Sequence, residues 1–375
     1  MELHETTSDF APAFGDAPDL TIVGAGPCGL FAAFYAGMRG MKTVIIDSLP
    51  QLGGQLTSIY PEKYVYDVAG FPKILAKELS AALVEQALGF GPEVHLEEKI
   101  IGVERMSGIA LMDGASPAGG ARFAMHDGSK DPAAGPRSII KLSSQTGRSF
   151  YSKTVILALG AGAFMPKKLK LAEAEKFEAH GVHYVITDKS RFNGKRVLIV
   201  GGGDSAVDWA IELGKIAKKT TLIHRHDKWR AHEATVAWMM SGPVEVRTFW
   251  ELKSILGEDH VRAALVFNNK TGEEDLLEVD DIVVCMGFLV DLRFLRSWGF
   301  EIKDNALSVN QQMLTSMEGV YGCGDIVTHP GKIKLITTGQ GEAAVAVNFA
   351  YAYLNPGASV FPGHSSNLDI PFAKK

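Results

Sequence analysis

The sequence predicts an α/β fold with two Rossmann-like units, each made of parallel strands and helices. Two observations carry this prediction. Two glycine-rich loops, Gly24–Gly29 and Gly201–Ala206, each follow a short apolar run and precede an alanine-containing stretch of helical character. The apolar runs, residues 20–23 and 196–200, have the length and composition of buried strands. A strand, a glycine loop and a helix in this order are typical of dinucleotide-binding folds.

The two glycine loops are the first candidate binding sites. Small residues let the backbone turn tightly and approach a pyrophosphate, and the helix that follows offers free N–H groups and a positive dipole end. We therefore expect one dinucleotide at each loop. The candidate contacts are Gly24, Gly26, Pro27 and Gly29 in the first loop, and Gly201, Gly203, Asp204 and Ser205 in the second.

Two carboxylates indicate which dinucleotide the first loop binds. Asp47 ends the apolar run 43–46, at about the ~20-residue offset where an acidic side chain takes a ribose hydroxyl pair. A carboxylate at this place disfavours a 2′-phosphate, and FAD has no such phosphate. Asp325 ends a second strand-like segment of small residues, 319–325, and its oxygens suit polyol hydroxyls. The sequence therefore predicts FAD at the first site.

The second site carries cations where the first carries an acid. The apolar run 220–223 leads into a basic segment that contains Arg225, His226 and Arg230. Charge-assisted contacts to a phosphate are worth about 1.5–3 kcal/mol each, enough for a strong preference for a 2′-phosphate. This pattern favours NADPH or NADP⁺. The alternative is that the segment is only the solvated basic start of a helix.

The order of these signals along the chain predicts an inserted domain. A strand at 153–160 completes the first unit, the second unit then follows and closes with a strand at 281–285, and the segment with Asp325 returns to the first unit. We expect an NADP domain inserted in a split FAD domain. The predicted division is a flexible tail over 1–18, the FAD-binding domain over 19–163 and 289–375, and the NADP-binding domain over 164–288.

Composition excludes several classes of function. The chain has 375 residues, is 46% hydrophobic and 22% charged, and carries a net charge of −5, so there is no nucleic-acid signature. No apolar run reaches the ~18 residues of a membrane span, and the N-terminal segment lacks an apolar signal core. We expect a cytoplasmic protein without a membrane or nucleic-acid partner. With three cysteines and no C-x-x-C spacing, neither a disulfide framework nor a metal site is predicted.

A segment rich in Gly, Ala, Ser and Pro extends from about residue 107 to 136. It lies between a predicted strand near 100–103 and a predicted hairpin strand at 139–142. We expect a long surface loop that extends a β-meander, with a partner site as the alternative.

Four sequence blocks resemble the ferredoxin–NADP reductases of the thioredoxin-reductase-like class. They are SLPQLGGQL at 48–56, IYPEKYVYDVAGFP at 59–72, GGGDSAVDWA at 201–210 and RAHE at 230–233. The resemblance extends over nearly all of 20–366. It implies a homodimeric FAD enzyme in which NADPH delivers a hydride to flavin N5 and single electrons then pass to ferredoxin or flavodoxin.

The resemblance also implies further cofactor contacts. Gln55 would contact the flavin, and Ile100 and Phe164 would line the cofactor. Tyr60 would stack on one face of the isoalloxazine and His364 would cover the other, while Ser366 would lie near the reactive edge. Tyr60 and His364 are thus the implied catalytic pair, acting by stacking without acid or base chemistry.

The chain departs from related patterns in two places. Thioredoxin reductases carry a redox C-x-x-C before the second glycine loop, but here the stretch 182–190 contains no cysteine. The usual second arginine of the phosphate-binding segment is His226, which would help only when protonated.

Two other functions remain open from the sequence. One is an NADPH diaphorase or oxidase that acts on a small-molecule acceptor, and the other is a non-catalytic redox sensor that binds both nucleotides. For an acidic protein partner, the candidate docking lysines are Lys167, Lys168, Lys170, Lys332 and Lys334. A solvated lysine face is the alternative.

Overall fold

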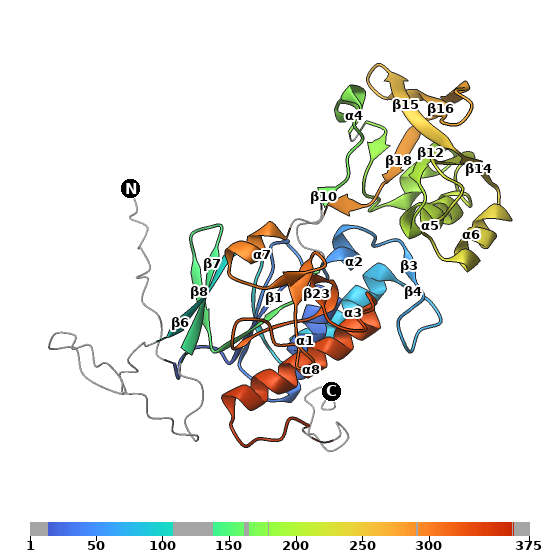
Figure 1. The fold of residues 1–375 in the computed structure, drawn as a ribbon. Helices are drawn as coiled ribbons and strands as arrows, with labels where there is room; N and C mark the ends of the chain where they lie inside the picture. The colour runs from blue at the N-terminus through green and yellow to red at the C-terminus, as the bar shows by residue number, and fades with distance from the viewer. Residues whose placement is uncertain are drawn as a thin grey trace, which may run out of the picture. The chain divides into compact units, whose positions relative to one another are not determined.

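The computed structural model describes residues 14–107, 138–160, 165–178, 180–289, 292–361 and 363. The chain divides into two compact units (Figure 1). The first comprises Met1–Thr57, Val65–Gly162 and Asp291–Lys375, and the second comprises Ser58–Tyr64 and Ala163–Val290. The expected loop over 107–136 lies almost wholly outside the described residues.

The first unit is built on a five-stranded parallel sheet in the order β22-β9-β1-β2-β5. Val23 pairs with Ile46 on one side and with Leu157 on the other, so the carboxyl ends of these strands lie at one edge. The bounds are β1 Leu20–Val23, β2 Thr43–Ile46, β5 Glu93–His95, β9 Thr154–Leu157 and β22 Val320–Gly322. The strands expected at 20–23 and 43–46 are confirmed, and β1, β2 and β9 are buried throughout.

Three long helices accompany this sheet: α1 Pro27–Met38, α3 Ala76–Leu88 and α8 Ile336–Leu354. The helix α1 packs against both α3 and α8 (Figure 1). Close packing is possible because α1 presents small buried residues, among them Ala32, Ala33 and Ala36. A glycine loop followed by α1 is therefore held rigidly at the carboxyl edge of the sheet.

An antiparallel meander completes the main structure of the first unit. It consists of β6 Ile100–Ser107, β7 Ser138–Ser144 and β8 Ser149–Ser152, in that order. The meander expected from the sequence is confirmed. The smaller elements are α2 Gln55–Ser58, β3 Tyr64–Val65, β4 Ile74–Leu75, α7 Arg293–Ser297, β20 Ile302–Lys303, β21 Ala306–Ser308, η2 Gly324–Ile326 and β23 Val327–Thr328.

The second unit repeats the architecture. Its parallel sheet has the order β11-β18-β12-β13-β14, with bounds Val182–His183, Asp281–Cys285, Arg196–Gly201, Lys219–His224 and Val244–Thr248. An antiparallel sheet contains β15 Trp250–Gly257, β16 Val261–Asn268 and β17 Glu274–Glu278. The other elements are β10 Met165–Pro166, β19 Phe288–Leu289, α4 Ala172–Lys176, η1 Lys189–Phe192, α5 Asp204–Leu213 and α6 Glu233–Met240.

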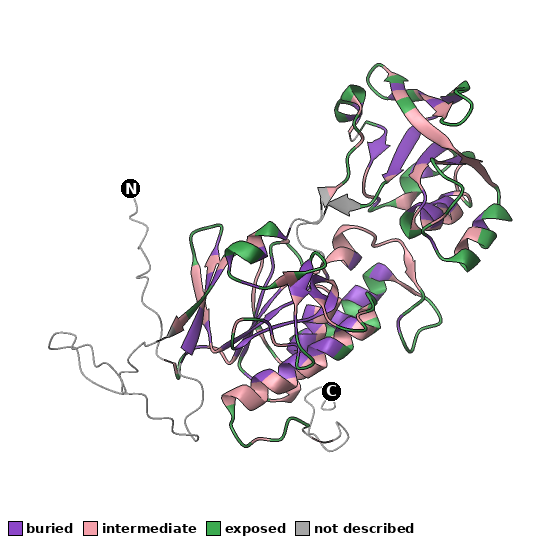
Figure 2. Cartoon of the chain, in the orientation of Figure 1, coloured by how far each residue is buried: buried purple, intermediate pink, exposed green. Residues whose placement is uncertain are grey.

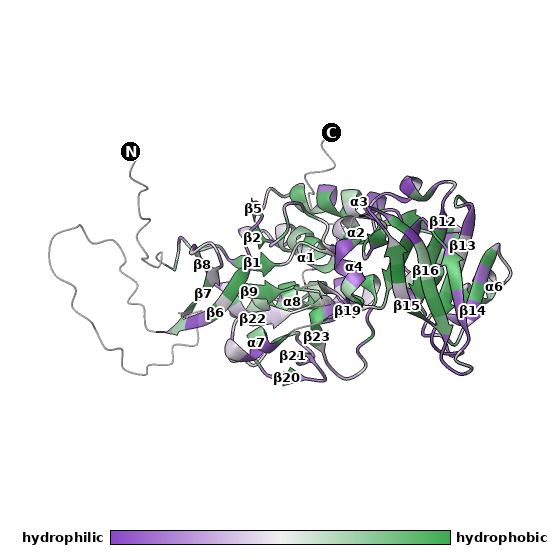
Figure 3. Ribbon diagram, turned by 90° about the horizontal axis from the view of Figure 1, so that it is seen from above, coloured by the Kyte–Doolittle hydropathy of each residue, from purple (hydrophilic) through white to green (hydrophobic). Residues whose placement is uncertain are grey.

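The core of the second unit follows the alternation of a strand buried on both faces. On β12, Leu198 packs in a cluster with Ile255 and Val266, whereas Val197 and Ile199 pack in a second cluster with residues of α5. Buried residues concentrate in the strands of both units (Figure 2), and β1, β9 and β16 have hydrophobic colours (Figure 3). The predicted fold class, two Rossmann-like domains of α/β type, is confirmed.

The segment 58–64 groups with the second unit, whereas the expected division kept it in the first. Lys63 forms an ion pair of 2.7 Å with Asp208 of α5, and the Lys189 ammonium lies 5.9 Å from the ring centroid of Tyr64. These contacts join residues more than a hundred positions apart. Among the described residues, none of the helices combines the length and apolar character needed to cross a bilayer.

Candidate dinucleotide-binding sites

In the first loop, two glycines are required by packing. Gly24 has φ +109°, and a Cβ on it would lie 2.3 Å from the carbonyl oxygen of Ala158. A Cβ on Gly29 would lie 1.8 Å from the carbonyl oxygen of Gly24. These two positions hold the turn between β1 and α1 close to β9, so any side chain there disrupts the loop.

Gly26 is not required by packing, and this difference points to a ligand. Its φ is −75°, which any residue adopts, and the atom nearest to an added Cβ would be the Cα of Gly54 at 4.0 Å. Gly26 is the N-cap of α1, and Pro27 follows at the first helical position. The space in front of Gly26 therefore lies beside free backbone N–H groups and the positive end of the helix dipole. A pyrophosphate fits this chemistry.

Asp47 lies at the end of β2 and is 8% exposed. Its two carboxylate oxygens accept hydrogen bonds from the backbone N–H of Ala25 at 2.5 Å and of Leu49 at 2.8 Å. Burial raises the pKa of Asp47, and these backbone hydrogen bonds act in the opposite direction. The side chain is thus fixed against the glycine loop, with further lone pairs on both oxygens for ribose hydroxyls.

The other predicted contacts of the first site lie in several different elements. Asp325 lies in η2, which follows β22 at the carboxyl edge of the sheet. Gln55 begins α2, and its amide nitrogen would lie 3.4 Å from a Cβ on Gly160, just after β9. Ile100 begins β6 and is 7% exposed. Tyr60 lies in the segment 58–64, and the expected contacts Phe164, His364 and Ser366 fall outside the described residues.

The second loop repeats the distinction between packed and open glycines. A Cβ on Gly201 would lie 2.3 Å from the carbonyl oxygen of Cys285, and one on Gly202 would lie 2.2 Å from the imidazole of His224. Gly203 has no atom within 4 Å of an added Cβ, its φ is −101°, and it is the N-cap of α5. Of the next two residues, Asp204 accepts a hydrogen bond from the His232 backbone N–H at 3.1 Å. Ser205 is exposed.

The predicted cations gather beside this second loop. Arg225, His226 and Arg230 are exposed, and the Arg230 backbone N–H donates to the Gly202 carbonyl at 2.9 Å. This bond ties the basic segment to the glycine loop. A phosphate next to the ribose of a nucleotide bound there would meet an exposed, positively charged surface.

His224 also packs at the junction of the second glycine loop and the basic segment, although the sequence predicted no role for it. Its ring packs over Gly202 and lies 4.9 Å from the ring centroid of Trp229. Burial lowers the pKa of His224, and the charges of Arg225 and Arg230 lower it further. The neutral form of the imidazole is thus favoured, and the ring packs between the glycine loop and the basic segment. In the sequence, the sign of this packing is the glycine at position 202, which leaves room for the ring.

One docking candidate is wrong. Lys332 has a side chain only 7% exposed, and its ammonium pairs with the carboxylate of Glu342. A buried, paired lysine offers no charge to a protein partner. Lys168 forms an exposed ion pair with Glu178 at 2.8 Å. Lys334 is exposed, as the prediction requires.

The thiols are unsuited to disulfide chemistry. Burial raises the pKa of Cys28 and of Cys285 to about 12, and burial raises the pKa of Cys323 as well. Thiolate, not thiol, is the nucleophile in thiol–disulfide exchange. All three cysteines of the chain are free.

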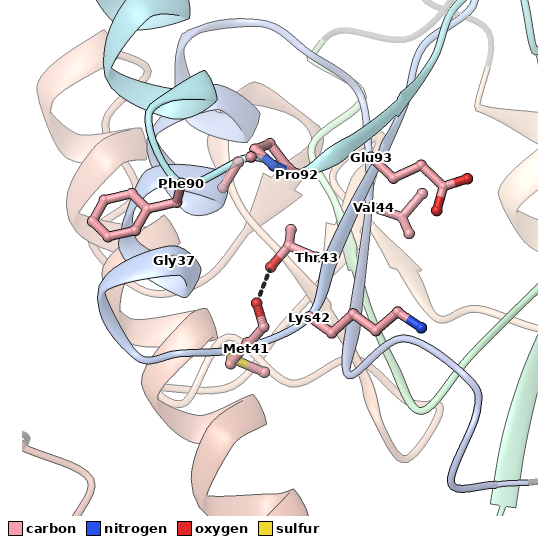
Figure 4. A pocket seen from close by; sticks show the side chains of 10 residues that line it. Gly37, Met41, Lys42, Thr43, Val44, Phe90, Pro92 and Glu93 are labelled. Carbon is pink, nitrogen blue, oxygen red and sulfur yellow. Dashed lines mark hydrogen bonds between the residues drawn. The ribbon is translucent and has the colours of Figure 1, made fainter. Parts of the chain in front are cut away.

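A cavity of about 290 Å³ lies in the first unit, away from the glycine loop. Its lining includes Gly37, Thr43, Phe90 and Glu93 (Figure 4). Thr43 and Glu93 are the first residues of β2 and β5, so the cavity lies at the amino edge of the sheet. Nucleotides bind at the carboxyl edge of such sheets, and the cavity is therefore separate from the candidate site.

Together the two units define a class: an oxidoreductase with two dinucleotide-binding domains. The family model described as pyridine nucleotide-disulphide oxidoreductase matches residues 18–343. The chain is 46% identical over 357 residues to ferredoxin–NADP reductase 2 of Chloroherpeton thalassium, covering 94% of this chain and 96% of that protein. It is also 46% identical over 360 residues to the ferredoxin–NADP reductase of Thermus thermophilus, covering 95% and 98%.

Among solved structures, the fold resembles the thioredoxin reductase of Lactococcus lactis, with a TM-score of 0.72 at 25% identity, covering 90% of this chain and 99% of that chain. The thioredoxin reductase of T. acidophilum has a TM-score of 0.73 at 23% identity, covering 89% of this chain and 98% of that chain. The chain belongs to the pyridine nucleotide-disulphide oxidoreductase family and, within it, to the ferredoxin–NADP reductases.

Proposed function

We propose that this protein transfers electrons between NADPH and a ferredoxin through bound FAD. The observation that supports this most is the pair of open N-cap glycines, Gly26 and Gly203, one in each unit. Two pyrophosphate sites in one chain fit a protein that binds two dinucleotides. When bound, FAD supplies the chemistry that converts a hydride from NADPH into single electrons.

The chain's residues divide between the two nucleotides by charge. Asp47 and Asp325 offer acceptor oxygens in the first unit, which suits the hydroxyl-rich FAD. The basic segment of the second unit suits the 2′-phosphate of NADP. We assign FAD to 19–163 with 289–375, and NADP to 164–288. The proposed FAD contacts also include Gln55, Tyr60, Ile100, Phe164 and Ser366, with Tyr60 and His364 stacking on the flavin.

A protein with an iron–sulfur cluster is the proposed acceptor, with flavodoxin as an alternative of the same electron chemistry. Two curated relatives at 46% identity are named for ferredoxin and NADP. The raised pKa values of the Cys28 and Cys285 thiols argue against a dithiol route. The absence of a C-x-x-C motif argues the same.

The test is an anaerobic titration of the FAD-loaded protein with NADPH, followed by mixing with oxidised ferredoxin. We expect NADPH to bleach the flavin absorbance and ferredoxin to restore it while becoming reduced. Rapid NADPH consumption in air without ferredoxin would favour a diaphorase or oxidase. Binding of both nucleotides with no bleaching would favour a redox sensor, and either result would replace this proposal.

We further propose that the protein is a homodimer, as the resemblance implies, and that it is cytoplasmic, as the composition indicates. Light scattering coupled to size-exclusion chromatography measures the mass directly against the 375-residue chain. A monomer at micromolar concentration would contradict the assembly without affecting the assignment of the two nucleotides.

A further inference from the structure

A buried charged cluster lies behind the segment that carries Asp325. Glu342 of α8 is 8% exposed, and both of its oxygens accept from the Lys332 ammonium, at 2.6 and 2.7 Å. His329 completes the cluster, with Nε2 3.0 Å from Glu342 Oε1. Replacing a buried ion pair by apolar residues is often neutral or stabilising. Stability alone is therefore a weak reason for this cluster.

The same carboxylate holds the backbone of the candidate FAD site. Glu342 Oε2 accepts a hydrogen bond from the Gly324 N–H at 2.9 Å, and Gly324 directly precedes Asp325. Gly324 has φ +78°, and a Cβ on it would lie 3.0 Å from Cys28 Sγ in the first turn of α1. The chain at Gly324 is thus fixed between the carboxylate of α8 and the start of the helix that follows the glycine loop.

Asp325 lies close to the ion pair of Glu342 and Lys332, because it directly follows Gly324. Asp325, Glu342 and Lys332 all act on the Cys28 thiol, the two carboxylates by raising its pKa and the ammonium by lowering it. The hydrogen bond from the Gly324 N–H to Glu342 puts the ion pair beside Asp325, the proposed ribityl contact, and the closeness of Gly324 to Cys28 Sγ puts it beside the first turn of α1. A substitution of Glu342 is therefore expected to affect both Asp325 and the first turn of α1.

We propose that Glu342 is a positioning residue for FAD: it holds the Gly324 N–H, so that the Asp325 carboxylate meets the ribityl chain. The ammonium of Lys332 neutralises the buried carboxylate of Glu342. The inference rests on the proposed binding of FAD to the first unit. It assigns to Lys332 a part inside the cofactor site in place of ferredoxin docking.

Two double variants separate the hydrogen bond from the ion pair. Glu342→Gln with Lys332→Met removes both charges but keeps an amide oxygen for the Gly324 N–H. Glu342→Leu with Lys332→Met removes the charges and also the acceptor. Both lack an unpaired buried charge, so both are expected to fold. Lys153→Met is the matched control, because Lys153 is 15% exposed and pairs with Asp19 at the amino edge of the same sheet.

The measurements use full-length protein loaded with FAD. Flavin release after dilution is followed by fluorescence, the environment of bound flavin by visible circular dichroism, and folding by thermal unfolding of the FAD-free protein. We expect the Gln double variant and Lys153→Met to release FAD within about threefold of the wild-type rate. We expect the Leu double variant to release it at least about tenfold faster with an altered dichroism spectrum, because the Gly324 N–H loses its acceptor; a tenfold change corresponds to ~1.4 kcal/mol.

Equal FAD release and equal spectra from the two double variants would overturn the inference and leave FAD binding intact. Faster release from both, in parallel with a loss of thermal stability, would also overturn it, because the cluster would then act only on the fold. Failure of the wild-type protein to bind FAD would overturn the proposed function itself.

Discussion

Gly201 and Gly203 lie two residues apart in one loop, yet alanine is expected to act differently at each. A Cβ on Gly201 would overlap the Cys285 carbonyl oxygen at 2.3 Å, so Gly201→Ala must displace β12 from β18 or distort the loop. At Gly203 nothing lies within 4 Å and φ is −101°. Gly203→Ala should leave the fold intact and remove only the space that a pyrophosphate needs.

The magnitudes at Gly203 follow from two opposing terms. Alanine lowers the entropy of the unfolded chain and stabilises by about 0.4–1 kcal/mol, while alanine as an N-cap costs about 0.5–1 kcal/mol relative to glycine. The net change in unfolding free energy is therefore within ~0.5 kcal/mol. A methyl group that displaces the pyrophosphate from one backbone N–H costs about 1.5–3 kcal/mol of binding, or roughly ten- to hundredfold in NADPH affinity.

Urea unfolding of the nucleotide-free variants gives the stability, and calorimetric titration with NADPH gives the affinity. Gly201→Ala is expected to lose both, whereas Gly203→Ala loses only affinity. The reasoning is refuted if Gly203→Ala binds NADPH within about twofold of wild type, or if it unfolds more easily than Gly201→Ala.

Three further predictions concern the basic segment, the glycine at the first N-cap and the thiols. Arg225→Ala or Arg230→Ala should weaken NADPH by about 1.5–3 kcal/mol and leave NADH nearly unchanged, measured by titration with both coenzymes; equal losses would contradict the phosphate assignment. Gly26→Ala should lower FAD retention without lowering the stability of the FAD-free protein, because no atom lies closer than 4.0 Å to the added methyl group. Burial raises the pKa of Cys28 and of Cys285 from 9.0 to about 12, so ionisation favours the unfolded chain. Stability should fall as pH rises from about 9 toward 12, and alkylation at pH 9 should be slow until urea is added; fast labelling of the folded protein would contradict the burial.

The sequence predicted those parts of the fold in which local patterns and tertiary structure agree. The strands 20–23 and 43–46 are short, mainly apolar runs that are buried at every position, and 281–285 is buried at every position but Cys285, so their composition identifies them. The glycine loops follow from their positions after such strands. In sequence, however, Gly24, Gly26 and Gly29 look alike. Only the structure shows that a side chain at Gly24 or Gly29 would overlap backbone atoms, whereas the space beside Gly26 is open to a ligand.

Contacts between distant or irregular segments could not be predicted in the same way. Lys332 and Lys334 are two lysines that alternate with Ile333 and Leu335, and nothing local distinguishes the buried side chain of Lys332 from the exposed Lys334. Its partner Glu342 lies in a helix that begins four residues later, and the hydrogen bond to Gly324 spans eighteen positions. The segment 58–64 shows the same limit, since the ion pair of Lys63 with Asp208 depends on which faces meet after folding.

The thiols support the proposed electron acceptor, which differs from the acceptor of disulphide reductases with the same fold. Cys28 lies in the first turn of α1, close to the glycine loop, but it packs against Gly324 and Gly339, and Asp325 and Glu342 oppose its ionisation. Burial raises the pKa of Cys28 to about 12, so the protonated thiol is the favoured form at pH 7. Cys285 is equally protonated. Neither thiol is therefore prepared for disulfide exchange, which agrees with the proposed route in which electrons pass from the cofactor directly to the protein partner.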